Sequence, residues 1–128
     1  MFDTKHLNAA PDPTPGYVPA EMVAQRMLAS PGVDLHELAA GTLIRLLTQN
    51  SEYRIVLLDP EAGRVQVEGG RYFRTPTEAV LNGSSCGGSM LRMGWIGVGL
   101  QVELDYPLQP DQFVTVVTSP VEGFWLER

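Results

Sequence analysis

Gly41 divides the chain into two parts with different hydrophobic periods. After it, apolar and polar residues alternate in short runs, as they do in strands with one buried face. The clearest pair is Glu52–Asp59 and Arg64–Glu68, whose connection Pro60-Glu61-Ala62-Gly63 favours a tight turn. We therefore expect a β-hairpin there. The same pattern predicts strands over 42–48, 52–59, 64–68, 78–82, 100–106, 113–118 and 124–127.

These runs predict a mainly β domain over residues 41–128, a small antiparallel β-barrel or sandwich of six or seven short strands. Before it we expect an N-terminal Pro-rich arm and a short helix. Four prolines make residues 1–19 an extended arm. Residues 20–40 are predicted to be a helical segment, in which helical spacing of apolar residues indicates a helix over 20–29 that Ser30-Pro31-Gly32 ends. One or two further turns are expected over 34–40, with Asp34 as their N-cap. Packing of the arm on its own domain or on another subunit stays open.

The charge balance bears on possible partners. The chain has a net charge of −6, and its cations are eight arginines and one lysine. Duplex nucleic acid is therefore not expected as a partner, because phosphate binding draws its affinity from clustered cations. Arginine suits fixed, bidentate contacts, so a small anionic ligand is one candidate partner. For other partners the sequence favours self-association or a second protein.

Cysteine content and hydropathy bear on the cellular compartment. Cys86 is the single cysteine, so no intramolecular disulfide can form. The first residues lack the basic and then apolar run of a signal peptide. The longest apolar stretch, Met93 to Leu100, is too short and Gly-rich to span a bilayer. We expect a cytoplasmic protein without membrane insertion.

Few residues suit catalysis or metal binding. Two histidines and one cysteine have no spacing typical of a metal site, and we expect neither metal nor cofactor. Gly83-Ser84-Ser85-Cys86-Gly87 has the letters of a serine-hydrolase elbow, which requires a strand, a strained turn and a helix. A small hydrolase using Ser85 or Cys86 is thus one alternative. A glycine turn between strands is the simpler interpretation, and a non-catalytic protein is favoured.

One overlapping motif suggests a ligand site. The string from Asn82 to Gly88 reads Asn-x-Ser-x-x-Gly-Gly and resembles the second motif of PilZ domains, small β-barrels that bind cyclic di-guanylate. The resemblance implies an anion or cyclic-nucleotide sensor. In that family an Arg-x-x-x-Arg pair precedes the barrel, and this chain lacks one. Arg71 and Arg74, which flank two aromatic residues, are three apart, and Arg45 and Arg54 are nine apart. The candidate ligand-binding residues are Arg71, Arg74, Asn82, Ser84, Gly87 and Gly88.

The string Met93 to Gly99 separates apolar residues by glycines. Such a string forms either a kinked strand of the core or an apolar loop that meets a partner. In the second case Trp95 and Ile96 are the candidate interface residues, because tryptophan is enriched at interfaces. Together with the lack of a catalytic set, this string makes a non-catalytic, homo-oligomeric binding or assembly module the leading hypothesis.

Overall fold

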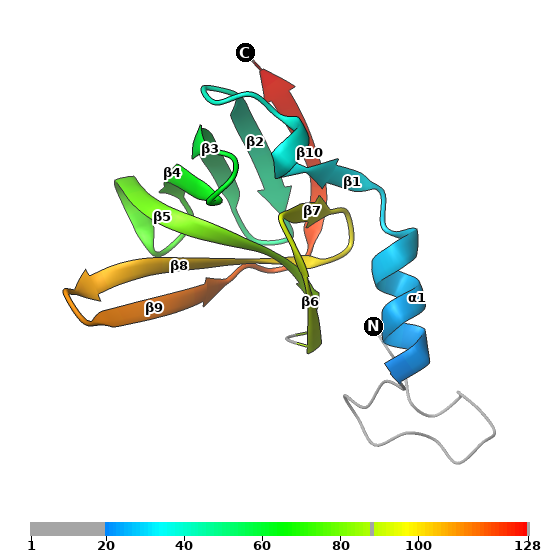
Figure 1. Cartoon of the computed structure of the whole chain (residues 1–128). Helices are drawn as coiled ribbons and strands as arrows, with labels where there is room; N and C mark the ends of the chain where they lie inside the picture. Colours follow the sequence, from blue (N-terminus) through cyan, green and yellow to red (C-terminus); the bar gives the residue numbers. More distant parts are fainter. Residues whose placement is uncertain (1–19, 88, 128) are drawn as a thin grey trace.

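The computed structural model describes residues 20–87 and 89–127, so the predicted arm over 1–19 lies outside the described residues. Ten strands, one α-helix and one 3₁₀ turn follow each other along this part of the chain (Figure 1). They are α1 (Ala20–Ala29), β1 (Gly32–Asp34), η1 (Leu35–Glu37), β2 (Leu43–Thr48), β3 (Glu52–Asp59), β4 (Arg64–Gly69), β5 (Phe73–Cys86), β6 (Ser89–Met93), β7 (Trp95–Gly97), β8 (Gln101–Gln109), β9 (Gln112–Val117) and β10 (Val121–Glu127).

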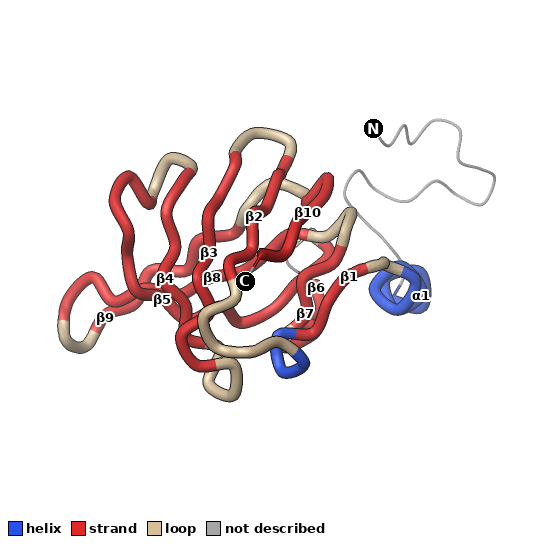
Figure 2. The backbone as a smooth tube through the Cα atoms, turned by 90° about the horizontal axis from the view of Figure 1, so that it is seen from above, coloured by secondary structure: helices blue, strands red, loops and turns tan. Residues whose placement is uncertain are grey.

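The predicted fold class is confirmed, because the described chain is mainly antiparallel β and sandwich-like. The main sheet has the order β10-β2-β3-β4-β5-β8-β9, with β6 also paired to β5. β1 and β7 form a separate pair. Seen from above, the strands bend around a shared interior with α1 outside them (Figure 2). No pairing of the described strands joins β9 to β10, so the sheet is open and not a closed barrel.

The hairpin β3–β4 forms as predicted from its alternation. Ile55 lies opposite Val67, and both side chains are fully buried in the core. The turn is stabilised by the Asp59 carboxylate, which accepts a hydrogen bond from the backbone N–H of Glu61 at 3.1 Å. Apolar residues on the inward face of the sheet complete the core; those with the largest fully buried side chains are Phe73, Leu35, Ile44, Leu46, Ile55, Leu57, Leu81, Ile96, Leu100, Leu104, Val65 and Val67.

The span from residue 78 to 87 differs from its prediction. A short strand ending at Asn82 and a glycine turn after it were expected, but β5 continues through both to Cys86. Gly83 marks a bulge in β5 and not a turn, since the register with β8 shifts between Leu81 and Gly83. The first half of β5 pairs with β4 and the second half with β6. One edge of β5 is therefore paired with β4 along its first half and with β6 along its second half, while β8 pairs with the other edge.

In the N-terminal segment the helix predicted over 20–29 is confirmed as α1, and a turn capped by Asp34 follows it, but a short strand that was not predicted lies between them. Helix α1 ends at Ala29, and Gly32–Asp34 then pairs with β7 as β1. Asp34 does act as an N-cap, although of a 3₁₀ turn, and its side chain accepts from the backbone N–H of His36. Of the helices in the described part of the chain, none is long and apolar enough to cross a membrane.

Candidate functional site

Arg71 lines the larger of two cavities that concern the predicted site residues. This cavity is a groove of about 480 Å³ at the open side of the main sheet. One bank is the end of β9, and the other is formed by the β2–β3 and β4–β5 turns. Arg74 is exposed but does not line it. The lining residues are Asn50, Ser51, Tyr53, Arg71, Tyr72, Val116, Val117, Thr118 and Ser119.

The groove has a positive and hydrogen-bonding character. Its lining contains one guanidinium, several hydroxyls and an amide, and no carboxylate. Three arginines of the sheet are paired with carboxylates, as where Arg64 donates to Glu78 at 2.8 Å and Arg45 donates to Glu52 at 3.1 Å, whereas Arg74 on β5 forms no ion pair within the described residues. Arg71 has no carboxylate within ion-pair distance in the described part of the chain. Its charge is therefore available to a ligand.

The other predicted ligand-binding residues lie apart from Arg71. Asn82 lines a second, smaller cavity of about 110 Å³ between the start of η1 and the β3–β4 turn. Ser84 is buried, donates to the carbonyl of Trp95 at 2.6 Å and accepts from the N–H of Gly97 at 3.2 Å. Its hydroxyl therefore links β5 to β7, and its side chain has no exposed area that a ligand could contact. Gly87 is exposed, and Gly88 lies outside the described residues.

The candidate nucleophiles are not beside a histidine. Ser85 is 1% exposed, and its hydroxyl has no hydrogen-bond partner within the described residues. The Cys86 sulfur accepts from an Arg26 guanidinium nitrogen of α1 at 3.4 Å. His36 instead lines the smaller cavity, whose lining includes neither residue. An elbow would also need a helix after the nucleophile, but β5 is followed by another strand.

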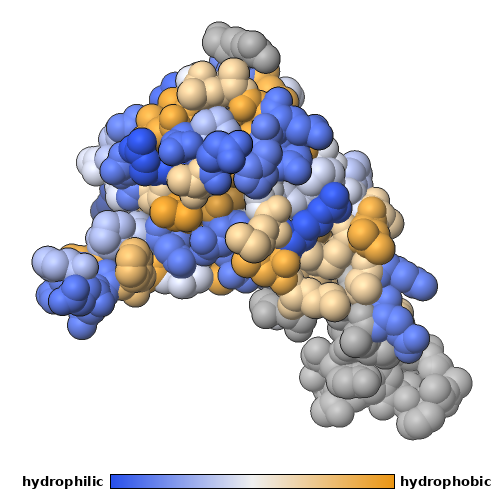
Figure 3. Space-filling model, in the orientation of Figure 1, coloured by the Kyte–Doolittle hydropathy of each residue, from blue (hydrophilic) through white to orange (hydrophobic). Residues whose placement is uncertain are grey.

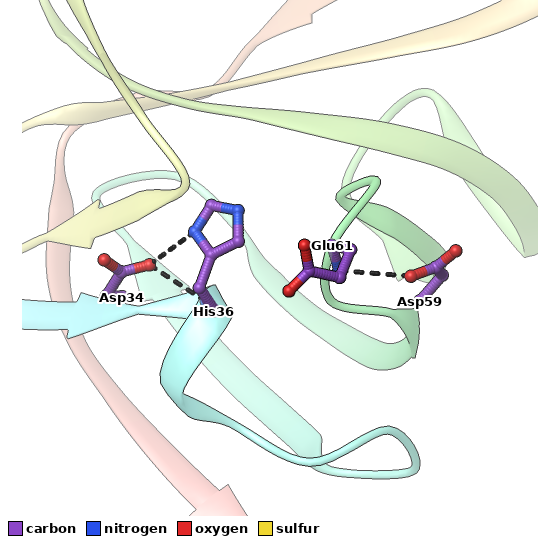
Figure 4. Close-up of polar contacts among 4 residues, drawn as sticks. All are labelled: Asp34, His36, Asp59 and Glu61. Atoms are coloured by element: carbon purple, nitrogen blue, oxygen red, sulfur yellow. Dashed lines mark hydrogen bonds and ion pairs between the residues drawn. The ribbon is translucent and has the colours of Figure 1, made fainter.

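His36 belongs to a carboxylate–imidazole pair that the sequence pattern alone suggested only as a polar helix start (Figure 4). The Asp34 carboxylate contacts both the backbone N–H and Nδ1 of His36, each at 2.9 Å. The pKa of Asp34 is lowered chiefly by that backbone hydrogen bond, against a smaller opposing effect of burial. Glu61, across the smaller cavity, faces the imidazole (Figure 4). The pair orients an imidazole, but no hydroxyl or thiol lines this cavity.

No metal centre is built from the described residues, because no three His, Cys, Asp or Glu side chains among them converge on a common point.

Trp95 attaches helix α1 to the β domain. Its ring packs on Met27 and Leu100, and the Arg92 guanidinium stacks on it at 3.7 Å. Arg92 also donates to the carbonyl of Met27 in the last turn of α1, at 3.3 Å. Trp95 is half-buried in these contacts, whereas Ile96 is fully buried in the core. Of the two predicted interface residues, only Trp95 therefore retains exposed surface.

Exposed apolar side chains lie on both elements that this attachment joins. Leu28 on α1 and Met93 at the end of β6 are each 76% exposed. Figure 3 shows apolar surface over β6, β7 and the adjoining end of α1. We call the surface of these two adjoining elements the α1–β6 face; its exposed apolar residues are Met22 and Leu28 on α1 and Met90, Leu91 and Met93 on β6, of which Met93 also lines the smaller cavity.

Comparison with known proteins gives no relative to draw on: no protein-family model, no curated protein and no solved structure matches the chain.

Proposed function

We propose that the chain is a non-catalytic assembly module that self-associates through the α1–β6 face. The observation that carries this proposal is that two adjoining elements, α1 and β6, both carry exposed apolar side chains, with Leu28 and Met93 more exposed than the other large apolar residues of the described chain. Single exposed apolar residues are ordinary, but grouped ones indicate an interaction surface.

The composition of the face suits protein contact. Three of its five residues are methionines, whose flexible side chains adapt to a facing surface. In a two-fold symmetric pair each copy presents the same patch, so apolar surface meets apolar surface. Trp95 joins the two elements of the face, because its ring contacts both Met27 of α1 and the Arg92 guanidinium of β6. Assembly requires no catalytic group, which agrees with the separation of Ser85 and Cys86 from His36.

The proposal is tested by sedimentation velocity on the full chain and on two charge variants, Leu28→Glu and Met93→Glu. We expect the wild-type chain to sediment as an oligomer and both variants to sediment as monomers, because a buried unpaired carboxylate opposes association. The matched control is Leu108→Glu, since Leu108 at the end of β8 is 58% exposed and lies outside the face. Unchanged oligomers in both variants, or equal disruption by the control, would reject the α1–β6 face.

A further inference from the structure

Strand β9 ends the main sheet with an unpaired edge. On the edge of β9 that faces β8, the backbone N–H of Thr118 donates to the carbonyl of Val102, and Val116 lies opposite Leu104. Hydrogen-bonded positions alternate along an antiparallel pair, so the backbone groups of Thr115 and Val117 point away from β8. These groups have no backbone partner within the described residues. They are the donors and acceptors that an added strand would use.

Natural sheet edges are commonly protected by charge, proline or a bulge, and β9 has none of these. Its six residues, Gln112 to Val117, carry no charge and no proline, and its register with β8 is regular from Phe113 to Val117. Phe113 is 68% exposed and Val117 is 45% exposed. An uncharged, regular and exposed edge of this kind is a template for strand addition.

The groove described above runs beside this edge, because its lining includes Val116 to Ser119. A strand added to β9 would place alternate side chains on opposite faces of the extended sheet. Side chains opposite Val116 would point inward, toward the groove with Arg71 and Tyr72. Side chains opposite Val117 would lie outside, beside exposed apolar residues. The site thus selects acidic residues at inward positions and apolar residues at outward ones.

We infer that β9 binds, by strand addition, an extended peptide of another protein in which apolar and acidic residues alternate, with an acidic side chain paired to Arg71. Charge complementarity favours this occupant, since Arg71 has no carboxylate partner in the described chain and no carboxylate lines the groove. A second β9 strand is less suitable, because it carries no charge of its own to meet Arg71. This site is separate from the α1–β6 face.

The test uses the full chain and a fluorescent, acetylated Val-Glu-Val-Glu-Val peptide, with binding followed by fluorescence anisotropy. We expect saturable binding that a Val-Lys-Val-Lys-Val peptide does not show. Arg71→Ala should weaken binding about tenfold, because a charge-assisted hydrogen bond is lost. The matched control is Arg74→Ala, which removes an exposed arginine outside the groove and should leave binding unchanged.

The backbone part is tested at Thr115. Thr115→Pro removes an outward N–H, and proline is tolerated at a sheet edge, so the variant should fold but not bind. Thr115→Val removes only the hydroxyl, which donates to Asp105 at 2.6 Å, and should bind normally. A peptide with N-methyl groups at alternate positions should fail to bind the unaltered chain, so the test holds even if Thr115→Pro misfolds.

Three outcomes would overturn the inference. The first is equal binding of the acidic and basic peptides. The second is displacement of the peptide by free glutamate or inorganic phosphate at matching concentration, which would make the groove a small-anion site. The third is loss of oligomers in Thr115→Pro without peptide binding to the unaltered chain, which would assign the edge to a second copy.

Discussion

Gly83 permits the change of partner within β5. Residues that carry a side chain rarely adopt its backbone φ of +148°. A Cβ at this position would lie 2.9 Å from the carbonyl carbon of Arg92. We expect Gly83→Ala to lower the free energy of unfolding by about 3 kcal/mol, from backbone strain and from displacement of β6. Urea denaturation measures this loss.

Gly99 provides the control for that substitution. It has a φ of +88° but no atom within 4 Å of the position a Cβ would take. Gly99→Ala should therefore cost only local strain, about 1 kcal/mol. Equal losses at the two positions would mean that close packing against β6 contributes nothing at Gly83.

The ionisation of Asp34 makes the free energy of unfolding depend on pH. Its pKa in the folded chain is lowered from 3.8, first by the backbone N–H of His36 and then by its imidazole. The ionised carboxylate therefore stabilises the fold above that value, and the contribution is lost as the pH falls through the lowered pKa. Asp34→Asn keeps a capping oxygen but removes the charge.

The measurement is Tm as a function of pH for the wild-type chain and Asp34→Asn. The wild-type chain should be more stable at neutral pH, and the difference should shrink as the pH falls below 3.8. A difference that is constant down to the acid limit would show that the charge of Asp34 is not its source.

Secondary-structure elements were predictable where apolar alternation alone determines them. The β3–β4 hairpin has that pattern, and alternate apolar residues in it, such as Ile55 and Val67, are buried. The second half of β5 does not, since Ser84 and Ser85 are polar yet buried. Ser84 is accommodated because its hydroxyl joins β5 to the carbonyl of Trp95. Such a long-range partner leaves no periodic signal in the sequence.

The candidate groove was predictable only in part, for a similar reason. Arg71 and Arg74, which flank two aromatic residues, were predicted as candidate ligand-binding residues from the sequence. The other bank, from Val116 to Ser119, lies more than forty residues further along the chain and reads as an ordinary strand end. Only the bending of the sheet brings the two together. The glycine turn predicted after Asn82 was wrong because glycine bulges and glycine turns look alike in sequence.

At the level of elements, we expect Trp95 to hold α1 on the sheet. Trp95→Ala should expose Met27 and release Arg92, and should lower the free energy of unfolding by about 2 kcal/mol. Amide exchange in residues 20–29 should then become fast while β3 and β4 remain protected. The control is Trp125→Ala on β10, since Trp125 is largely exposed. Unchanged protection of α1 in Trp95→Ala would contradict this role.

At the scale of the whole molecule, net charge and apolar surface have opposing effects on self-association. The chain has a net charge of −6, which keeps copies apart at long range. The α1–β6 face is apolar and draws them together on contact. Added salt should therefore strengthen association by screening the repulsion between copies, whereas an ion-paired interface would weaken.

The molar mass of the full chain in solution, measured by light scattering from micromolar to millimolar concentration at low and high salt, tests self-association most directly. We predict a mass above 14.0 kDa that rises with concentration and is higher in high salt. A mass that stays at 14.0 kDa at every concentration and in both salts would contradict the assembly function.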